Sequence, residues 1–288
     1  MTTRAFIKPA VATALASVFC AALGLTTFGA QAQEGSKLDQ IRESGTVTVG
    51  TEAAYEPFEF IIDGEITGYS KQILDAVVED LGVGLNQLNL PFQGILPGVL
   101  AKKFDFVATS VSINPERAAK YAYTRPIGTV QTIVLVRADN TDIQSAADLD
   151  GKVVATQLAS AEQPVVEEFS AELEANGGEG FADLKLFQAF PETYVAVGSG
   201  QVDAALIGSN GAAALMRAQP GKFKVVGEVG EPRYLAWVTH PDDTDLRDYL
   251  NGVIGSLADS GKLAEWQQEW FGFTMTLPAE GYLPEGAL

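Results

Sequence analysis

Apolar segments with strand character alternate with helix-like segments through most of this 288-residue chain. In the first of the helix-like segments, Ile73, Leu74, Val77 and Leu81 recur at helical spacing. Strands that alternate with amphipathic helices build mainly parallel sheets with helices on both faces. The sequence therefore predicts an α/β fold, with strands at 46–50, 87–90, 104–109, 131–136, 152–156, 184–187, 203–207, 223–226 and 234–239.

Two polar breaks divide this α/β series. The first is the loop 137–140, and the second is the segment 227–233, GEVGEPR, which is rich in glycine, proline and charge. A complete α/β unit lies between them, so we expect one lobe to be inserted into another and joined to it by two crossing strands. The predicted organisation is lobe 1 at 33–129 and 234–288, and lobe 2 at 130–233.

The N-terminus has the pattern of an export signal. Arg4 and Lys8 precede the apolar run 11–28, and small residues before Gln33 suit cleavage after about Ala32. A retained membrane helix is the alternative, but polar residues and glycine interrupt the run. We therefore expect a periplasmic protein, from which Cys20, the only cysteine, is removed with the signal.

Charge and composition narrow the possible partners. The chain carries 37 acidic and 19 basic residues and a formal net charge of −18. Such a surface repels phosphate backbones and anionic lipids, so we expect no nucleic-acid partner and no binding to a membrane surface. His240 is the single histidine, which argues against histidine metal clusters and most histidine-dependent catalysis. We expect a monomer with no metal and no cofactor.

The segment 104–117, FDFVATSVSINPER, describes a buried strand that runs into the start of a helix. Ser110 and Ser112 bring hydroxyls to the carboxyl end of the strand, where open α/β sheets bind ligands. Asn114 stands where an N-cap should, so the amides that follow point outward unpaired. Arg117 adds a planar fork of donors that suits a carboxylate. An anion site is the sharper interpretation, and a capped helix with a surface arginine is the alternative.

Five stretches, taken in order, resemble the periplasmic solute-binding proteins of the polar amino acid family, bacterial extracellular solute-binding protein family 3. They are GTEAAYEPF at 50–58, GEITGY at 64–69, FQGILPGVL at 92–100, the segment 104–126, and the tail 257–272. The resemblance implies two α/β lobes that close over a ligand in the cleft between them. It also implies a receptor that delivers its small-molecule ligand to an ABC permease in the inner membrane.

The resemblance assigns a carboxylate site to the first lobe. It implies that Arg117 holds the ligand carboxylate with help from the amide of Ser112, while oxygens near Ser110 receive an amino group. A surface ion pair is the alternative role for Arg117.

The resemblance also assigns the walls of the cleft. Tyr55 and Phe92 match aromatic residues that sandwich the body of the ligand, and both could stack against a cationic group. Glu52 matches an acidic residue that meets a distal positive group. Ordinary core packing is the alternative for the two aromatics, and a solvated loop carboxylate is the alternative for Glu52.

The second lobe departs from the family pattern. Ser160, which forms a possible capping box with Gln163, matches a residue that grips the carboxylate, but Ala161 stands where a threonine is common. Gly208 stands where relatives often place an aspartate for the α-ammonium, and Asn210 nearby can accept a hydrogen bond but supplies no charge. The ligand is therefore left open among a polar amino acid, an opine, a betaine and ectoine.

An enzyme on the same scaffold is the remaining alternative, because some exported cyclohexadienyl dehydratases resemble these receptors. Such an enzyme needs a carboxyl general acid in the cleft, and Glu52 is the candidate. Without a cofactor motif or a nucleophile beside a base, we expect no enzymatic activity.

Overall fold

The computed structural model describes residues 36–288, so the export signal predicted at 1–32 lies outside the described residues. Residues 36–288 belong to one compact unit. Within 36–288, no helix is both long and apolar enough to cross a membrane.

The main sheet confirms the predicted α/β class. Its strand order is β10-β9-β11-β8-β12-β6-β1-β5, and β7 (Ala122–Tyr123) pairs with β12 beside this path. The pairs at both ends are parallel, whereas β8 and β12 pair antiparallel with each other and with their neighbours. The strands are β1 (Thr46–Thr51), β5 (Gly84–Asn89), β6 (Phe106–Ser112), β8 (Gly128–Arg137), β9 (Val153–Gln157), β10 (Asp183–Phe187), β11 (Ala204–Gly208) and β12 (Phe223–Thr239).

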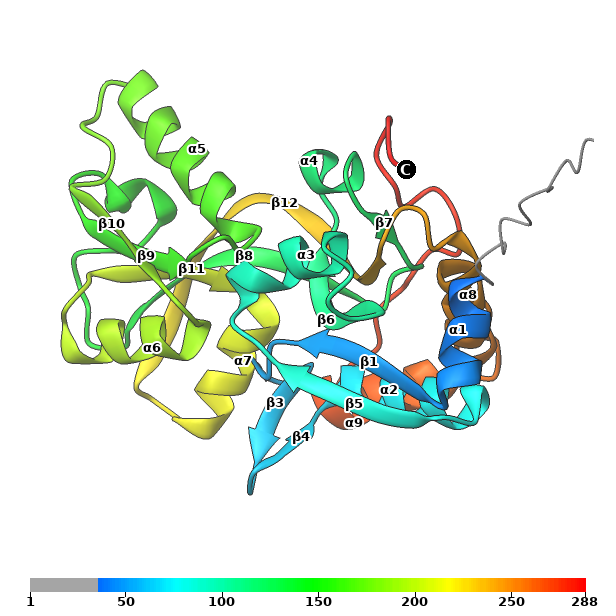
Figure 1. Ribbon diagram of the computed structural model, residues 1–288. Coiled ribbons are helices and arrows are strands. Elements are labelled where there is room, and N and C mark those ends of the chain that lie inside the picture. The colour runs from blue at the N-terminus through cyan, green and yellow to red at the C-terminus, as the bar shows by residue number, and fades with distance from the viewer. Residues whose placement is uncertain (1–35) are drawn as a thin grey trace, which may run out of the picture. The chain divides into compact units, whose positions relative to one another are not determined.

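Helices cover both faces of this sheet, as Figure 1 shows for α5 and α6 around β9, β10 and β11. Alternate residues of one strand face opposite layers, because side chains of a strand point to its two sides in turn. Leu206 of β11 packs in the cluster that contains Val166 of α5, while Ala205 packs in the cluster that contains Val197 of α6. The helices are α1 (Lys37–Ser44), α2 (Tyr69–Leu81), α3 (Phe92–Leu100), α4 (Pro115–Ala118), α5 (Glu162–Ala175), α6 (Phe190–Ser199), α7 (Ser209–Ala218), α8 (Thr244–Asp259) and α9 (Lys262–Phe271), with a 3₁₀ turn η1 (Ala146–Leu149).

Two lobes share the sheet. Lobe 1 is built on β1, β5 and β6 with α1 to α4, α8 and α9, and lobe 2 on β9, β10 and β11 with α5 to α7. Strands β8 and β12 run side by side between them and join the two lobes (Figure 1). The predicted boundaries at 129/130 and 233/234 fall inside these two strands. The exact residues at which lobe 1 ends and lobe 2 begins stay a prediction.

The segment 227–233, which was predicted to interrupt the α/β series, does not separate two strands. Residues Phe223–Thr239 form one strand, and its register against β8 shifts between Val225 and Gly227 and between Val229 and Arg233. Pro232 lies in the second shift, where the missing N–H costs no ladder hydrogen bond. The glycine and proline signal therefore marks irregular pairing in a crossing strand.

A small second sheet borders lobe 1. Strands β2 (Ala54–Tyr55), β3 (Glu59–Ile62) and β4 (Glu65–Thr67) pair antiparallel in this order. The β3–β4 turn uses Asp63 and Gly64, whose φ angles are 51° and 88°, as expected of a tight two-residue hairpin. Strands β3 and β4 therefore form a hairpin, and its first residue, Glu59, lines the cavity described below.

Two glycines bring α3 close to β1 around one aromatic ring. A Cβ on Gly50 of β1 would lie 2.7 Å from the ring of Phe104, and a Cβ on Gly98 of α3 would lie 2.7 Å from the same ring. Phe104 is 5% exposed, so its ring has little room to move. This contact fixes α3, and with it Phe92 at the start of the helix.

We expect Gly98→Ala to destabilise the fold by about 1 to 3 kcal/mol, because overpacking against Phe104 outweighs the better helix propensity of alanine. Gly94→Ala in the same helix is the matched control, since a Cβ there meets nothing within 4 Å. The control should gain about 0.5 to 1 kcal/mol. Urea denaturation measures both variants, and equal stabilities would contradict this account of the α3 contact.

Candidate functional site

A narrow cavity lies where lobes 1 and 2 meet. Its free volume is only about 20 Å³, which is room for about one water molecule. The carboxyl ends of β1, β6 and β9 lie beside it, as expected for an open α/β sheet. Thirteen residues line it: Glu52, Tyr55, Glu59, Phe92, Thr109, Ser110, Ser112, Arg117, Gln157, Ser160, Ala161, Glu162 and Phe190.

Seven of the eight predicted site residues are brought together in this cavity, namely Glu52, Tyr55, Phe92, Ser110, Ser112, Arg117 and Ser160. Asn210 is not among the lining residues. Its side-chain amide donates to the carbonyl of Thr129 at 2.7 Å. Asn210 therefore fastens α7 to the crossing strand β8.

The helix start at α4 has the predicted form. Asn114 is the N-cap, and its side chain accepts a hydrogen bond from the amide of Arg117 at 2.8 Å. The Arg117 guanidinium donates to the carbonyl of Ser112 at 3.3 Å and, across the cleft, to the carbonyl of Ala159 at 2.9 Å. Its carbon also lies 5.5 Å from the centre of the Phe92 ring.

Arg117 is a buried cation without an anionic partner. The residue is 9% exposed, and it makes no ion pair among residues 36–288. Burial lowers the pKa of its guanidinium, because the charged form loses water. Neutral carbonyls accept its hydrogen bonds, and no described carboxylate forms a direct ion pair with it, although the charge of Glu162 acts on it from farther away. The surface-residue alternative for Arg117 is therefore wrong.

Glu52 is a buried acid on the same cavity. It follows β1, is 6% exposed, and accepts a hydrogen bond from the side chain of Gln157 in lobe 2. Burial is the main cause that raises the pKa of Glu52 to about 8, and the charges of Glu59 and Glu162 raise it further. The solvated-loop alternative for Glu52 is therefore wrong, and the carboxyl keeps its proton at neutral pH unless a cation joins it.

Glu59 is a second buried acid, which sequence reasoning missed. It accepts hydrogen bonds from the Thr109 hydroxyl at 2.9 Å, the Ser110 amide at 2.8 Å and the Ser110 hydroxyl at 3.0 Å. Burial raises the pKa of Glu59 to about 7, and these hydrogen bonds oppose the rise. Because its oxygens are already engaged, Glu59 holds the end of β6 in place.

Aromatic rings line the cavity on both sides. Tyr55 stacks on Phe58 with ring centres 5.3 Å apart and lies 5.7 Å from Phe190 of lobe 2. A Cβ on Gly208 would lie 2.7 Å from the Tyr55 hydroxyl, so this hydroxyl fills the space that a side chain at 208 would need. The absence of an acidic side chain at position 208 therefore goes together with the position of the Tyr55 hydroxyl, which occupies the space that side chain would need.

The loop after β9 is only partly a capping box. The Ser160 hydroxyl accepts from the amide of Gln163 at 3.3 Å, but the Gln163 side chain accepts from the amide of Ala159. Ala159 has a φ of 60°, a left-handed conformation that is unfavourable for residues with a Cβ. This backbone turns the Ala159 carbonyl toward Arg117.

Glu162, at the first position of α5, is the third buried acid and was also missed. It is 4% exposed and pairs with Arg233 of β12 at 2.9 Å. Arg233 also donates to the Thr132 hydroxyl at 2.9 Å, while its Nε has no partner in the described part of the chain. The pair connects lobe 2 to a crossing strand at the edge of the cavity.

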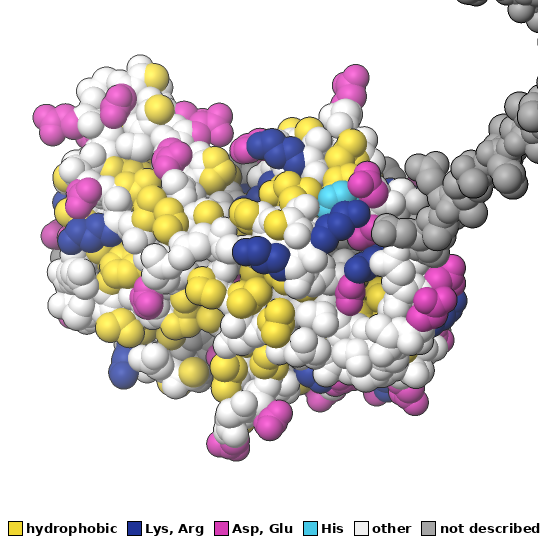
Figure 2. Space-filling view, viewed as in Figure 1, with side chains coloured by type: hydrophobic (Ala, Val, Ile, Leu, Met, Phe, Trp, Pro, Cys, Tyr) yellow, Lys and Arg dark blue, Asp and Glu magenta, His cyan; other side chains and the backbone are white. Residues whose placement is uncertain are grey.

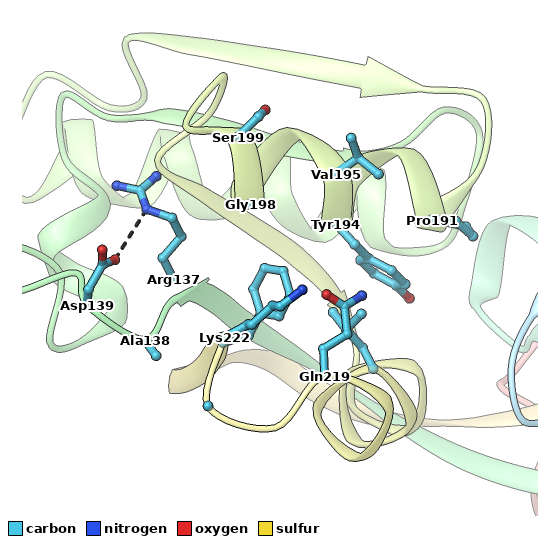
Figure 3. Close-up of a pocket in the computed structure, with 13 residues that line it drawn as sticks. Arg137, Ala138, Asp139, Pro191, Tyr194, Val195, Gly198, Ser199, Gln219 and Lys222 are labelled. Carbon is cyan, nitrogen blue, oxygen red and sulfur yellow. Dashed lines mark hydrogen bonds and ion pairs between the residues drawn. The ribbon is translucent and has the colours of Figure 1, made fainter.

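Other hollows lie outside this cavity. A groove of about 340 Å³ between α3, α4 and α5 shares Phe92, Arg117 and Ser160 with the cavity, and Figure 2 shows the surface hollowed there. A larger hollow of about 700 Å³ lies on lobe 2 (Figure 3). In it, Arg137 is already engaged by Asp139 and by a carbonyl of α6. The groove therefore borders the candidate site, whereas the larger hollow offers no comparable set of buried groups among the described residues.

The chemistry available in the cavity is recognition of a small charged molecule. A guanidinium, several carboxyls, hydroxyls and aromatic faces converge there. No group of three or more histidine, cysteine, aspartate or glutamate side chains within 36–288 could hold a metal ion. The cavity therefore suits a ligand that carries both a carboxylate and a cationic nitrogen.

The raised pKa of Glu52 predicts a pH dependence of stability. In the unfolded chain Glu52 ionises near pH 4.5, and in the folded protein near pH 8, so the folded state binds the extra proton between these values. The free energy of unfolding should therefore fall as pH rises through this window. Glu52→Gln should remove this part of the decline, which chemical denaturation from pH 5 to 9 measures. Parallel curves for the variant and the parent protein would refute the shift.

Comparison with known proteins assigns the chain to a family. The sequence pattern described as "Bacterial extracellular solute-binding proteins, family 3" matches residues 47–273. The chain is 27% identical to the L-cystine-binding protein TcyA of Bacillus subtilis over 245 residues, 84% of this chain and 87% of TcyA.

Solved structures agree with this assignment. One of ArgBP from T. maritima superposes with a TM-score of 0.73 and 26% identity, covering 82% of this chain and 99% of that one. The ancestral amino acid-binding protein AncCDT-1, a precursor of cyclohexadienyl dehydratase, gives 0.73 and 29% identity, covering 82% of this chain and all of that one. Both the pattern and the fold place this chain among the bacterial extracellular solute-binding proteins of family 3.

Proposed function

We propose that this chain is the periplasmic substrate-binding subunit of an ABC importer for an amino acid or a related small nitrogenous carboxylate. Relatives named for binding cystine and arginine support this class of ligand. The proposed ligand contacts are those of the cavity, with Arg117 for the carboxylate and Glu52 for a distal cation. We further propose that the protein acts as a monomeric receptor without enzymatic activity.

The observation that carries this proposal is the buried, unpaired guanidinium of Arg117. A buried charge is costly unless an opposite charge and hydrogen bonds accompany it. Its guanidinium donates to the carbonyl oxygens of Ser112 and Ala159, which are neutral acceptors. A ligand carboxylate would replace these weaker acceptors with a charged, bidentate one.

The balance of charge in the cavity supports a cationic group on the same ligand. Three acids, Glu52, Glu59 and Glu162, face one unpaired arginine. Arg233 compensates Glu162, and four neutral donors surround the other two acids. A cationic group beside Glu52 would favour the ionised form of this carboxyl, so a zwitterion or a cationic amino acid could place an opposite charge at both Arg117 and Glu52.

The size of the cavity supports hinge motion. An amino acid is much larger than about one water molecule, so it can occupy this cavity only if the lobes separate. The side-chain hydrogen bonds that must break include Glu52 with Gln157, Arg117 with Ala159, and Gln93 with Gln188, together with the ring contact of Tyr55 with Phe190. The ligand would then reconnect the lobes with its own charges, which is the usual basis of such closure.

We expect Arg117→Ala to weaken ligand binding at least about tenfold, since a hydrogen bond to a charged group contributes about 1.5 to 3 kcal/mol. A thermal-shift screen of amino acids, opines, betaines and ectoine against the parent protein identifies the ligand, because binding raises Tm with concentration. Isothermal titration of that compound then compares Arg117→Ala with Arg217→Ala, an exposed control on α7. No stabilisation across the screen would exclude the proposed ligand class.

A dehydratase-like activity is the second candidate, and one observation favours it. Glu52 keeps its proton at neutral pH, as a general acid must. The likeness to AncCDT-1 adds weight, although that protein is itself described as amino acid-binding. Turnover of prephenate or arogenate by the purified protein, lost in Glu52→Gln, would favour the enzyme over the receptor.

A further inference from the structure

We propose that Glu162, held by Arg233, is the group of lobe 2 that receives the ligand's α-ammonium. This inference rests on the proposed function and assigns a role to a residue at the first turn of α5. It is carried by the burial of Glu162, by its free oxygen and by its place on the cavity wall just after the loop whose carbonyl contacts Arg117.

Glu162 is the only charged side chain that lobe 2 contributes to the cavity within residues 36–288. The other lining residues of lobe 2 are Gln157, Ser160, Ala161 and Phe190, all of them neutral. A ligand that draws lobe 2 onto lobe 1 by charge must therefore do so through Glu162.

One oxygen of Glu162 is available to a ligand. Oε1 accepts from Arg233 at 2.9 Å. Oε2 receives no hydrogen bond from any described residue. It is also not one of the fully buried polar atoms that lack a hydrogen-bond partner. The Arg233 ion pair holds the carboxyl group at the cavity wall, with its second oxygen free.

The position of Glu162 fits an α-ammonium better than that of Glu52. In an α-amino acid the ammonium and the carboxylate share one carbon, so the acid that receives the ammonium must lie near Arg117. Arg117 donates to the carbonyl of Ala159, three residues before Glu162, whereas Glu52 is joined to Gln157 at the end of β9. Glu162 therefore lies close in the chain to the segment that contacts Arg117, and Glu52 is left to a more distant nitrogen.

The neighbouring strand end cannot supply this acid. A Cβ at Gly208 would lie 2.7 Å from the Tyr55 hydroxyl and 2.9 Å from a methyl of Val130. Glu59 also fails, because Thr109 and Ser110 already engage both of its oxygens. Glu162 thus remains as the acid with both a free oxygen and the right position.

Paired probes test this assignment by isothermal titration calorimetry. L-arginine is compared with the desamino analogue that lacks its α-ammonium, and L-cystine with the analogue that lacks both of its α-ammonium groups. The parent protein should bind at least one amino acid about tenfold or more tightly than its analogue. Glu162→Gln should abolish that preference, while Glu168→Gln, an exposed control on the same helix, and Glu52→Gln should keep it.

Each outcome separates the two claims. A Glu162→Gln variant that binds and keeps the preference would overturn the role of Glu162 and leave the proposed function intact. A parent protein that binds the desamino analogues equally well would overturn it too, even if the variant does not fold. If the parent protein binds none of these compounds, an amino acid ligand of this class is excluded, and the assignment of Glu162 falls with it.

Discussion

The burial of one arginine without an anion sets the character of this cleft. Arg117 lies at the first turn of α4, where the Asn114 cap and the end of β6 fix its backbone. Carbonyl oxygens from both lobes accept its hydrogen bonds but cannot neutralise its charge. A small molecule with a carboxylate can do so, and it can enter only when the lobes part. Charge compensation and closure are therefore linked in this fold.

The three acids of the cavity have different partners and therefore different structural roles. Glu59 is tied to β6 and holds the strand end, while Glu52 bridges to lobe 2 through Gln157. Glu162 is fixed by Arg233 of a crossing strand, so its position depends on the element that joins the lobes. The three carboxyls thus differ in their partners, although each is buried on the same cavity.

Local patterns predicted much of this architecture, and the resemblance to a known family supplied most of the residues that line the cavity. Strand and helix alternation and the Asn114 cap each follow from the spacing of a few neighbouring residues. Glu59 and Glu162 were missed because an isolated glutamate in a sequence usually lies on the surface. What buries them is distant in the chain: Ser110 for Glu59, and Arg233, 71 residues away, for Glu162. The one available signal for Glu162 was its place beside Ser160 in a loop already assigned to the ligand.

Glycine and proline positions that interrupt the sequence pattern were harder to interpret than the helices and strands. Glycine and proline at 227–233 predicted a loop, but they occupy register shifts of β12, because a long crossing strand tolerates irregular pairing. Gly208 suggested only a missing acid. Its packing against the Tyr55 hydroxyl shows that the space is taken, which requires contacts between residues more than 150 positions apart.

The most direct test of this account is a crystal structure of the natively purified protein with the small molecule that co-purifies with it. The account predicts a carboxylate in bidentate contact with the Arg117 guanidinium and a cationic nitrogen beside the carboxylates of the cavity. A ligand without a carboxylate at Arg117, or one bound in the lobe 2 hollow of Figure 3, would contradict it.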